Sequence, residues 1–174
     1  ADASLFNSDY RASERTFQLI TQASGRAGRG EKPGRVILQA YNIDDYAVQT
    51  AMAQDYEAFY QKEIVMRKIM HSPPFCHIGM VIVSGENQND AKESLVALKN
   101  QIQDKYSQRC KFECSDVLPS PISIIRNRYR WRIIIKMESI NLLIQLVNEA
   151  LDIFPKVKIG STDISVDIDP ASMI

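Results

Sequence analysis

Two arginines set among glycines form the part of this sequence whose residue types best suit chemistry. They lie in the segment Gln22-Ala23-Ser24-Gly25-Arg26-Ala27-Gly28-Arg29. Arginine carries a planar, permanently charged fork that fits phosphate oxygens, and it stabilises the charge that develops as a γ-phosphoryl group leaves. The glycines leave room for a tight turn or a close ligand. The segment therefore predicts that Arg26 and Arg29 are arginine fingers. The alternative is a helix that ends at a glycine, followed by solvated arginines.

A second candidate site is a run of alternating arginines near the middle of the chain. Successive side chains of a β-strand point to opposite faces, so a strand here places every second residue on one face. That face carries Arg126, Arg128, Arg130 and Arg132. Guanidinium groups spaced about 6.6 Å apart can follow a phosphate backbone, which predicts a nucleic-acid-binding stripe. The alternative is a solvated face whose arginines pair with acids of neighbouring strands. The candidate acids are Glu113, Asp116, Asp163 and Asp167.

Patterns that would bind a metal are weak. Cys76, Cys110 and Cys114 lack the paired C-x-x-C spacing of a zinc module. We predict small, reduced, buried thiols instead. Asp167 and Asp169 stand close together, but two carboxylates without further oxygen ligands rarely hold magnesium firmly. No metal site is therefore predicted, and the two aspartates are expected to end a strand.

The other half of a nucleotide site is missing from the sequence. It contains no G-x-x-x-x-G-K-[ST] loop and no acidic motif placed to hold magnesium after such a loop. Arginine fingers without a phosphate cradle hydrolyse nothing, so this chain alone is predicted to be inactive. The abrupt start at Ala1-Asp2-Ala3, with no complete α/β unit before the arginines, predicts a piece of a longer protein.

The elements in the first part of the chain follow from hydrophobic spacing and turn residues. Ser8 or Asp9 can cap a helix that runs to about residue 23. A short apolar run predicts a strand over 35–41, of the kind covered on both faces in a parallel sheet. Apolar residues then recur near helical spacing over 44–70 until Pro73-Pro74, which predicts a connector helix or a helix pair.

Beyond residue 75 the pattern alternates between strands and helices. Strands are predicted over 77–83, 111–118, 129–137 and 156–167, and helices over 90–106 and 140–154. The order β-α-β-β-α-β is that of the ferredoxin-like arrangement, an antiparallel sheet with both helices on one face. The residues between the arginines are predicted to be core, namely Tyr129, Trp131, Ile133 and Ile135. Pro119 and Pro121 are predicted to hold a loop open before that strand.

Composition sets wider limits. With 174 residues and 45% hydrophobic content, the chain can bury one core or two small ones, and it is predicted to be neither disordered nor membrane-spanning. The 21 basic residues balance the 21 acidic ones, so any contact with nucleic acid must come from local clusters. The first residues carry no secretion signal, which predicts the cytoplasm.

The wider sequence resembles a helicase family. The glycine-rich segment and its lead-in, Ser8 to Leu19, are similar to motif VI of superfamily-two helicases, and specifically to primosomal protein N′ (PriA), the family of bacterial replication-restart helicases. Later blocks are also similar to that family: Ser72-Pro73-Pro74-Phe75, Pro119-Ser120-Pro121-Ile122, Tyr129-Arg130-Trp131-Arg132 and Val166-Asp167-Ile168-Asp169-Pro170. The resemblance extends over the whole chain.

The resemblance implies the C-terminal part of an ATP-dependent 3′-to-5′ DNA helicase that recognises stalled or branched replication forks and starts primosome assembly. It implies an α/β and α+β fold in three parts. These are the end of a RecA-like helicase lobe over 1–45, a connector helix over 46–72, and a ferredoxin-like, ribosomal-protein-like domain that binds DNA and partners over 73–174. Arg26 and Arg29 are then expected to reach ATP bound by the missing first lobe, and Gln22 to help couple hydrolysis to DNA movement.

The resemblance also implies cofactors and partners. ATP and magnesium belong to the full-length protein, zinc to an upstream part absent from this chain, and none of them is expected to be bound by this chain. Expected partners are single-stranded and forked DNA, single-strand-binding protein and other primosome components, without a membrane, and the chain is expected to be a monomer. The family's basic and polar pair on the second helix of this domain has no basic counterpart in Ile140–Ile144, so no partner site is carried over.

Two other functions stay open. The first is a protein–protein interaction module of the primosome in which the arginine face is structural. The second is a nucleotide-binding enzyme of an unrelated type, which the missing phosphate loop opposes. Binding to DNA that weakens with salt distinguishes the helicase part from the interaction module.

Overall fold

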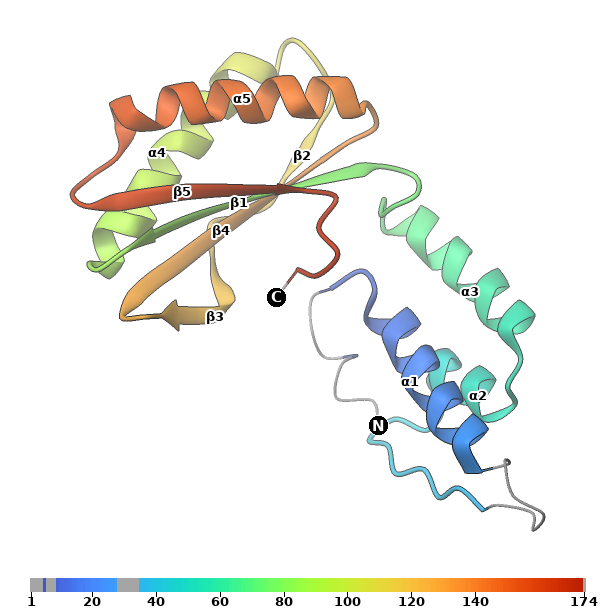
Figure 1. The fold of residues 1–174 in the computed structure, drawn as a ribbon. Helices are drawn as coiled ribbons and strands as arrows, with labels where there is room; N and C mark the ends of the chain where they lie inside the picture. Colours follow the sequence, from blue (N-terminus) through green and yellow to red (C-terminus); the bar gives the residue numbers. More distant parts are fainter. Residues whose placement is uncertain (1–4, 6–8, 28–34, 174) are drawn as a thin grey trace. The chain divides into compact units, whose positions relative to one another are not determined.

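The structure, a computed structural model, describes residue 5, residues 9–27 and residues 35–173 (Figure 1). The chain divides into two compact units, Ala1–Met70 and His71–Ile174. The first unit is helical in its described part, and the second combines two helices with an antiparallel sheet of five strands. The chain is therefore a mixed α/β protein.

Three helices make up the described part of the first unit: α1 (Ala12–Ala27), α2 (Tyr46–Met52) and α3 (Tyr56–Ile69). The Asp45 side chain caps α2 by accepting from the Ala47 amide at 2.8 Å. The Asp55 side chain caps α3 by accepting from the Ala58 amide at 2.9 Å. The region after residue 44 is thus a helix pair, the second of the two predicted alternatives.

Helix α1 continues beyond its predicted end. It was expected to stop near residue 23, yet Gly25 and Arg26 are helical. A glycine inside a helix costs only about 1 kcal/mol relative to alanine, which is too little to end a helix whose apolar face is already packed. That face belongs to a small core formed by Phe17, Ile20, Ala47, Val48, Ala51 and Phe59. Phe17 stacks on Phe59 with ring centroids 4.4 Å apart.

The predicted strand over 35–41 is wrong. Residues 35–40 form neither helix nor strand, and the Ile37 side chain is 82% exposed. A strand covered on both faces needs neighbouring strands to accept and donate its backbone hydrogen bonds. The described part of the first unit contains no such strand.

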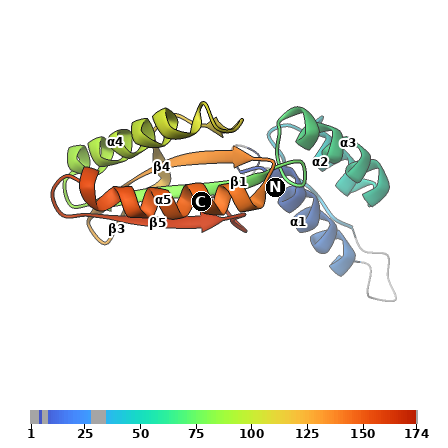
Figure 2. The ribbon, with the colours of Figure 1, turned by 90° about the horizontal axis from the view of Figure 1, so that it is seen from above.

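The second unit contains β1 (His77–Gly85), α4 (Gln88–Tyr106), β2 (Glu113–Cys114), β3 (Leu118–Ile125), β4 (Arg128–Met137), α5 (Ile140–Val157) and β5 (Thr162–Ile168). The strands lie in the order β2-β4-β1-β5, and β3 also pairs with β4. Every pairing is antiparallel. Helices α4 and α5 lie on the same face of the sheet (Figures 1 and 2).

The middle of this unit differs from the prediction. The expected strand over 111–118 is only the short β2, and the loop expected at Pro119 and Pro121 is part of β3. Prolines are tolerated because β3 pairs with β4 along one side only. The register also shifts between Pro119 and Ile124. Residues 120–123 of β3 therefore lie opposite Arg130 alone, in an irregular β-bulge.

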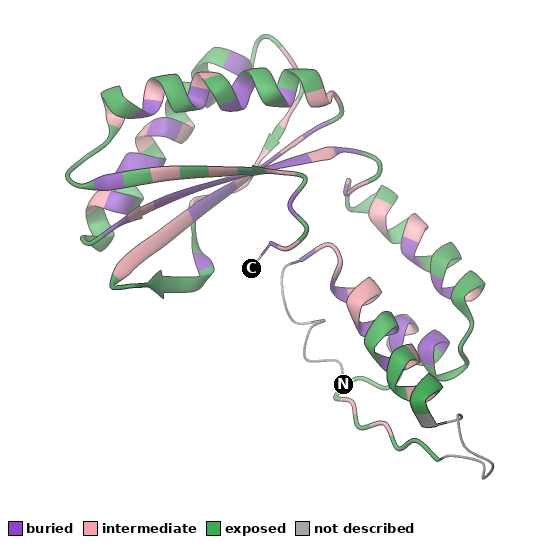
Figure 3. Cartoon of the chain, in the orientation of Figure 1, coloured by how far each residue is buried: buried purple, intermediate pink, exposed green. Residues whose placement is uncertain are grey.

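The core lies between the sheet and its two helices. The side chains of Val81, Val83, Ile133 and Ile135 are fully buried there against Leu95, Leu98 and Leu146 (Figure 3). Trp131 packs against this cluster, and Tyr129 is half-buried. The prediction that Trp131, Ile133 and Ile135 face the core is confirmed.

Tyr106, at the end of α4, should make the second unit sensitive to alkaline pH. Burial raises the pKa of Tyr106 to about 12, whereas an unfolded chain ionises tyrosine near 10. The stabilisation is therefore complete below about pH 10 and is progressively lost as the pH rises toward 12. Urea unfolding followed by the fluorescence of Trp131, the single tryptophan, measures this loss. Tyr106→Phe should remove most of the pH dependence, and Tyr41→Phe, at a side chain 89% exposed, should preserve it.

Candidate functional site

Gln22 and Arg26 lie one helical turn apart in the C-terminal half of α1, and both side chains are exposed. Residues four apart are neighbours on a helix surface, so the two side chains can meet the same ligand. Among the described residues, a Cβ atom added at the neighbouring Gly25 would contact nothing within 4 Å. Arg29, the other predicted arginine finger, lies outside the described residues.

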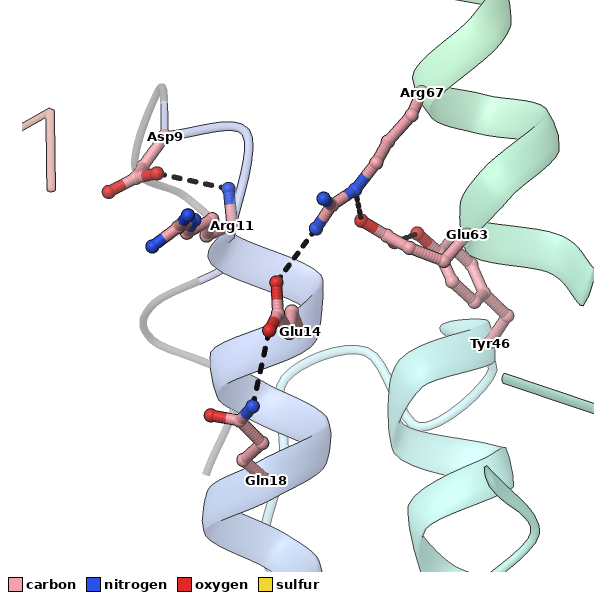
Figure 4. A network of polar contacts seen from close by, with 7 residues as sticks. All are labelled: Asp9, Arg11, Glu14, Gln18, Tyr46, Glu63 and Arg67. Carbon is pink, nitrogen blue, oxygen red and sulfur yellow. Dashed lines mark hydrogen bonds and ion pairs between the residues drawn. The ribbon is translucent and has the colours of Figure 1, made fainter. Parts of the chain in front are cut away.

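Charged side chains tie α1 to the other two helices of the first unit (Figure 4). Arg67 of α3 donates from Nη2 to Glu14 Oε2 of α1 at 2.8 Å, and from Nε to Glu63 Oε1 at 2.6 Å. Tyr46 of α2 donates its hydroxyl to Glu63 Oε2 at 2.6 Å. Burial, followed by this bond to Glu63, raises the pKa of Tyr46. Gln18 donates to Glu14 Oε1 at 3.2 Å.

Sequence reasoning did not find this network. Only the spacing of Glu63 and Arg67, four residues apart on one helix, signals an ion pair locally. The contact between Arg67 and Glu14 joins residues 53 positions apart. Its consequence is that the helix carrying Gln22 and Arg26 is held in place by charge-assisted hydrogen bonds as well as by apolar packing.

The four arginines of the predicted stripe do not share one strand face. Arg126 and Asn127 form the two-residue turn between β3 and β4, with φ of 49° and 60°. Two left-handed residues are what a tight hairpin of this kind requires, so Arg126 lies outside the strand. Arg132 is on β4 but only 5% exposed, and it donates to the backbone carbonyl of Met173 in the C-terminal segment. The prediction that all four arginines share one strand face is therefore wrong for Arg126, whereas Arg128, Arg130 and Arg132 alternate along β4. Their binding to nucleic acid stays a prediction.

Arg128 is engaged within the fold. Its Nη2 donates to Asp163 Oδ2 at 2.6 Å, to the Ser84 carbonyl at 3.0 Å and to the Ser161 carbonyl at 3.4 Å. Asp163 was one of the acids named in the alternative interpretation of this face. Arg128, directly after the turn, thus fastens the tip of the β3–β4 hairpin to the end of β1 and the start of β5.

Arg126 and Arg130 differ from these two. Arg130 Nη1 donates to the Ile122 carbonyl at 3.2 Å, across the bulge of β3. Arg126 is exposed and Arg130 is half-buried. In the part of the chain that the structure describes, neither forms an ion pair with a carboxylate. These two guanidinium groups leave the hairpin with uncompensated positive charge.

The hairpin also exposes large apolar side chains. The side chains of Leu118, Ile122, Ile124 and Ile125 are 50%, 48%, 50% and 41% exposed. A sequence signal for this hairpin does exist. Ile124-Ile125 and Tyr129 flank Arg126-Asn127, and asparagine is among the residues preferred where a two-residue turn needs a positive φ.

The remaining candidate residues have structural environments. Asp169 Oδ1 accepts from the Ile78 amide at 2.8 Å and Oδ2 lies 2.7 Å from His77 Nδ1, so Asp169 joins the end of β5 to the start of β1. Burial raises the pKa of Cys76 and of Cys114, which keeps both as thiols. Among the described residues, no group of three His, Cys, Asp or Glu side chains is arranged to hold a metal ion. No described helix has the length and apolarity needed to span a membrane.

Comparison with known proteins identifies relatives of this chain. Residues 68–171 match the family described as the primosomal protein N C-terminal domain. Replication restart protein PriA of Bacillus subtilis is 37% identical over 177 residues, which cover 100% of this chain and 22% of that protein. The PriA proteins of Synechocystis and Thermotoga maritima are 31% and 33% identical, each over 99% of this chain and 20% and 22% of their own length.

Among solved structures, the de novo designed protein Foldit4 aligns with 55% of this chain and 97% of its own length, with 8% identity and a TM-score of 0.42, a likeness too weak to support an argument. The chain spans about a fifth of the length of its PriA relatives. A family match over more than half of the chain, together with relatives above 30% identity along its whole length, shows that the chain belongs to the PriA family of replication restart proteins and contains their C-terminal domain.

Proposed function

We propose that this chain is the C-terminal part of an ATP-dependent 3′-to-5′ DNA helicase that restarts stalled replication forks. The first unit completes the ATP site of the full-length protein, and the second unit binds single-stranded and forked DNA. ATP and magnesium bind to parts of that protein outside this chain, and zinc binds upstream. Single-strand-binding protein and other primosome components are the proposed protein partners, and the cytoplasm is the proposed location.

We also propose a fold family for each unit. The first unit is proposed to be the end of a RecA-like helicase lobe, and the exposed Ile37 would be covered by other parts of that lobe. The second unit is ferredoxin-like. Its strands lie in the order β5-β1-β4, and β2 and β3 together occupy the fourth place beside β4.

The observation that supports DNA binding is the charge of the β3–β4 hairpin. Residues 117–137 contain five basic residues and no acidic one. Of these, Arg126 and Arg130 lie beside the turn without a carboxylate partner among the described residues. Lys and Arg side chains that neutralise phosphates release counterions, which makes the binding depend strongly on salt.

A salt series tests this proposal. The affinity of residues 1–174 for single-stranded DNA should fall with salt. In Arg126→Ala/Arg130→Ala, the log-log slope should be smaller in magnitude by about 1.4, because each phosphate contact on a single strand contributes about 0.7. Arg109→Ala/Lys111→Ala removes the same charge from exposed positions elsewhere in the second unit and should leave the slope unchanged. Equal slopes for the hairpin variant and the wild type would contradict the proposal.

The exposed aliphatic side chains of β3 support the interaction module as a second candidate function. β3 pairs with a strand on one side only, and four large apolar residues on it are exposed. Large exposed apolar patches often mark the surfaces through which a protein binds a partner. If the wild-type chain binds no DNA at any salt concentration, this second function replaces the first.

A further inference from the structure

We propose that the tip of the β3–β4 hairpin, residues 122–130, docks on the base pair that a DNA branch point leaves unstacked. Aliphatic side chains would cover the exposed face of that base pair while two arginines contact the phosphates beside it. This inference rests on the proposed DNA-binding function and assigns to one structural element the recognition of the branch.

The tip presents apolar side chains in two directions. Ile125 lies opposite Arg128, and Ile124 lies opposite Tyr129, so the two isoleucines point to opposite faces of the ribbon. Both are exposed, at 41% and 50%. Exposed aliphatic groups on both faces of a hairpin cannot all pack on one sheet. They suit an occupant that the hairpin enters.

The charge of the hairpin identifies the occupant as nucleic acid. A protein partner for a purely apolar strand would need no cations, yet Arg126 at the turn and Arg130 at the bulge carry charge without a carboxylate partner in the described part of the chain. Proteins that insert aliphatic wedges between bases combine them with arginine or asparagine side chains near the phosphates and the groove. Asn127 completes that combination.

The tip is held rigidly before it meets a ligand. Arg128 binds Asp163 and two backbone carbonyls at the end of β1 and the start of β5, which fixes the hairpin to the sheet. Arg130 bridges the bulge through the Ile122 carbonyl at 3.2 Å. A rigid element loses little conformational freedom on binding, so its contact energy appears as affinity.

The tip should bind a branch point with higher affinity than a continuous duplex. Inserting a side chain inside a duplex requires two stacked base pairs to separate. At a branch one face of the last base pair has already lost its neighbour, so the aliphatic side chains cover an open surface. We therefore expect the isoleucines to increase affinity for forks and to leave affinity for linear duplex and single strands almost unchanged.

The test compares Ile124→Ser/Ile125→Ser with the wild-type chain of residues 1–174 on a fork, a linear duplex and a single strand. We expect about a tenfold loss of affinity for the fork, because serine removes most of the apolar surface that the isoleucines would bury, and less than about a twofold change on the other two DNAs. A 2-aminopurine at the branch should change its emission on binding the wild type and not on binding the variant. Leu142→Ser/Ile144→Ser, on the exposed side of α5, is the matched control and should keep both signals.

A conservative variant separates insertion from misfolding. Ile124→Leu/Ile125→Leu keeps the aliphatic groups and should keep the preference for the fork. If the serine variant binds forks as the wild type does, insertion is overturned while DNA binding stands. If the serine variant loses affinity for all three DNAs equally, the hairpin contributes to binding but does not recognise the branch, which also overturns the inference. A wild-type chain that binds no DNA would overturn the proposed function itself.

Discussion

Replacing Arg26 by alanine in the full-length protein is expected to lower kcat for DNA-dependent ATP hydrolysis by about 10³-fold, the lower end of the effect of an arginine finger. The side chain is exposed near the end of α1, one turn after Gln22. In the proposed function it contacts a nucleotide bound by another part of the full-length protein. An interaction made only in the transition state lowers kcat and leaves KM for ATP nearly unchanged.

Steady-state ATPase rates at saturating DNA measure this effect. Arg26→Lys keeps the charge but not the planar fork, so it should recover only part of the rate. Arg109→Ala removes an exposed arginine of the second unit and should have no effect on kcat. If Arg26→Ala hydrolyses ATP within about tenfold of the wild type, the arginine-finger role passes to another residue.

Replacing Arg67 by alanine should destabilise the first unit by about 3 kcal/mol. The Arg67 side chain is 16% exposed, and it pairs with Glu63 at 9% and Glu14 at 36% exposure. Removing the cation leaves Glu63 largely buried without its counter-charge, and that uncompensated carboxylate costs more than the ion pair itself contributes. The ordering of α1 against α3 should weaken at the same time.

Hydrogen exchange of the α1 amides reports this loss without interference from the second unit. Lys68→Ala, at the exposed neighbouring position, is the matched control and should leave exchange unchanged. Glu63→Gln/Arg67→Met removes both buried charges and should recover much of the stability. Exchange in Arg67→Ala equal to that of the control would mean that apolar packing of Phe17 and Phe59 alone holds the helices together.

Features that depend only on neighbouring residues can be predicted from the amino-acid sequence. Asp9, one of the two residues predicted to cap the first helix, accepts from the Arg11 amide at 3.0 Å, because a cap needs only a side chain and an amide two or three residues later. The alternation of Trp131, Ile133 and Ile135 placed them on the core face, because a strand has a period of two wherever it lies. Family membership was also evident from local blocks.

The contacts of the polar side chains on the other face of β4 depend on the tertiary structure. Arg132 is buried because the C-terminal segment returns to place the Met173 carbonyl beside it, 41 residues away. Arg128 reaches Asp163, 35 residues away, and only the pairing of β1 with both β4 and β5 brings them together. Neither contact has a signal in local spacing.

The same distinction explains two of the differences between the predicted and the observed secondary structure. The segment 35–41 has the residue pattern of a buried strand, but a strand forms only when a neighbour supplies hydrogen bonds, and the described part of this unit supplies none. Pro119 and Pro121 locally favour a loop, yet they lie in β3. Proline has no backbone N–H to donate, and at the edge position and the bulge of β3 no such donor is required. Local chemistry thus determined caps, periodicity and family, whereas long-range pairing decided which cations remain available to a ligand.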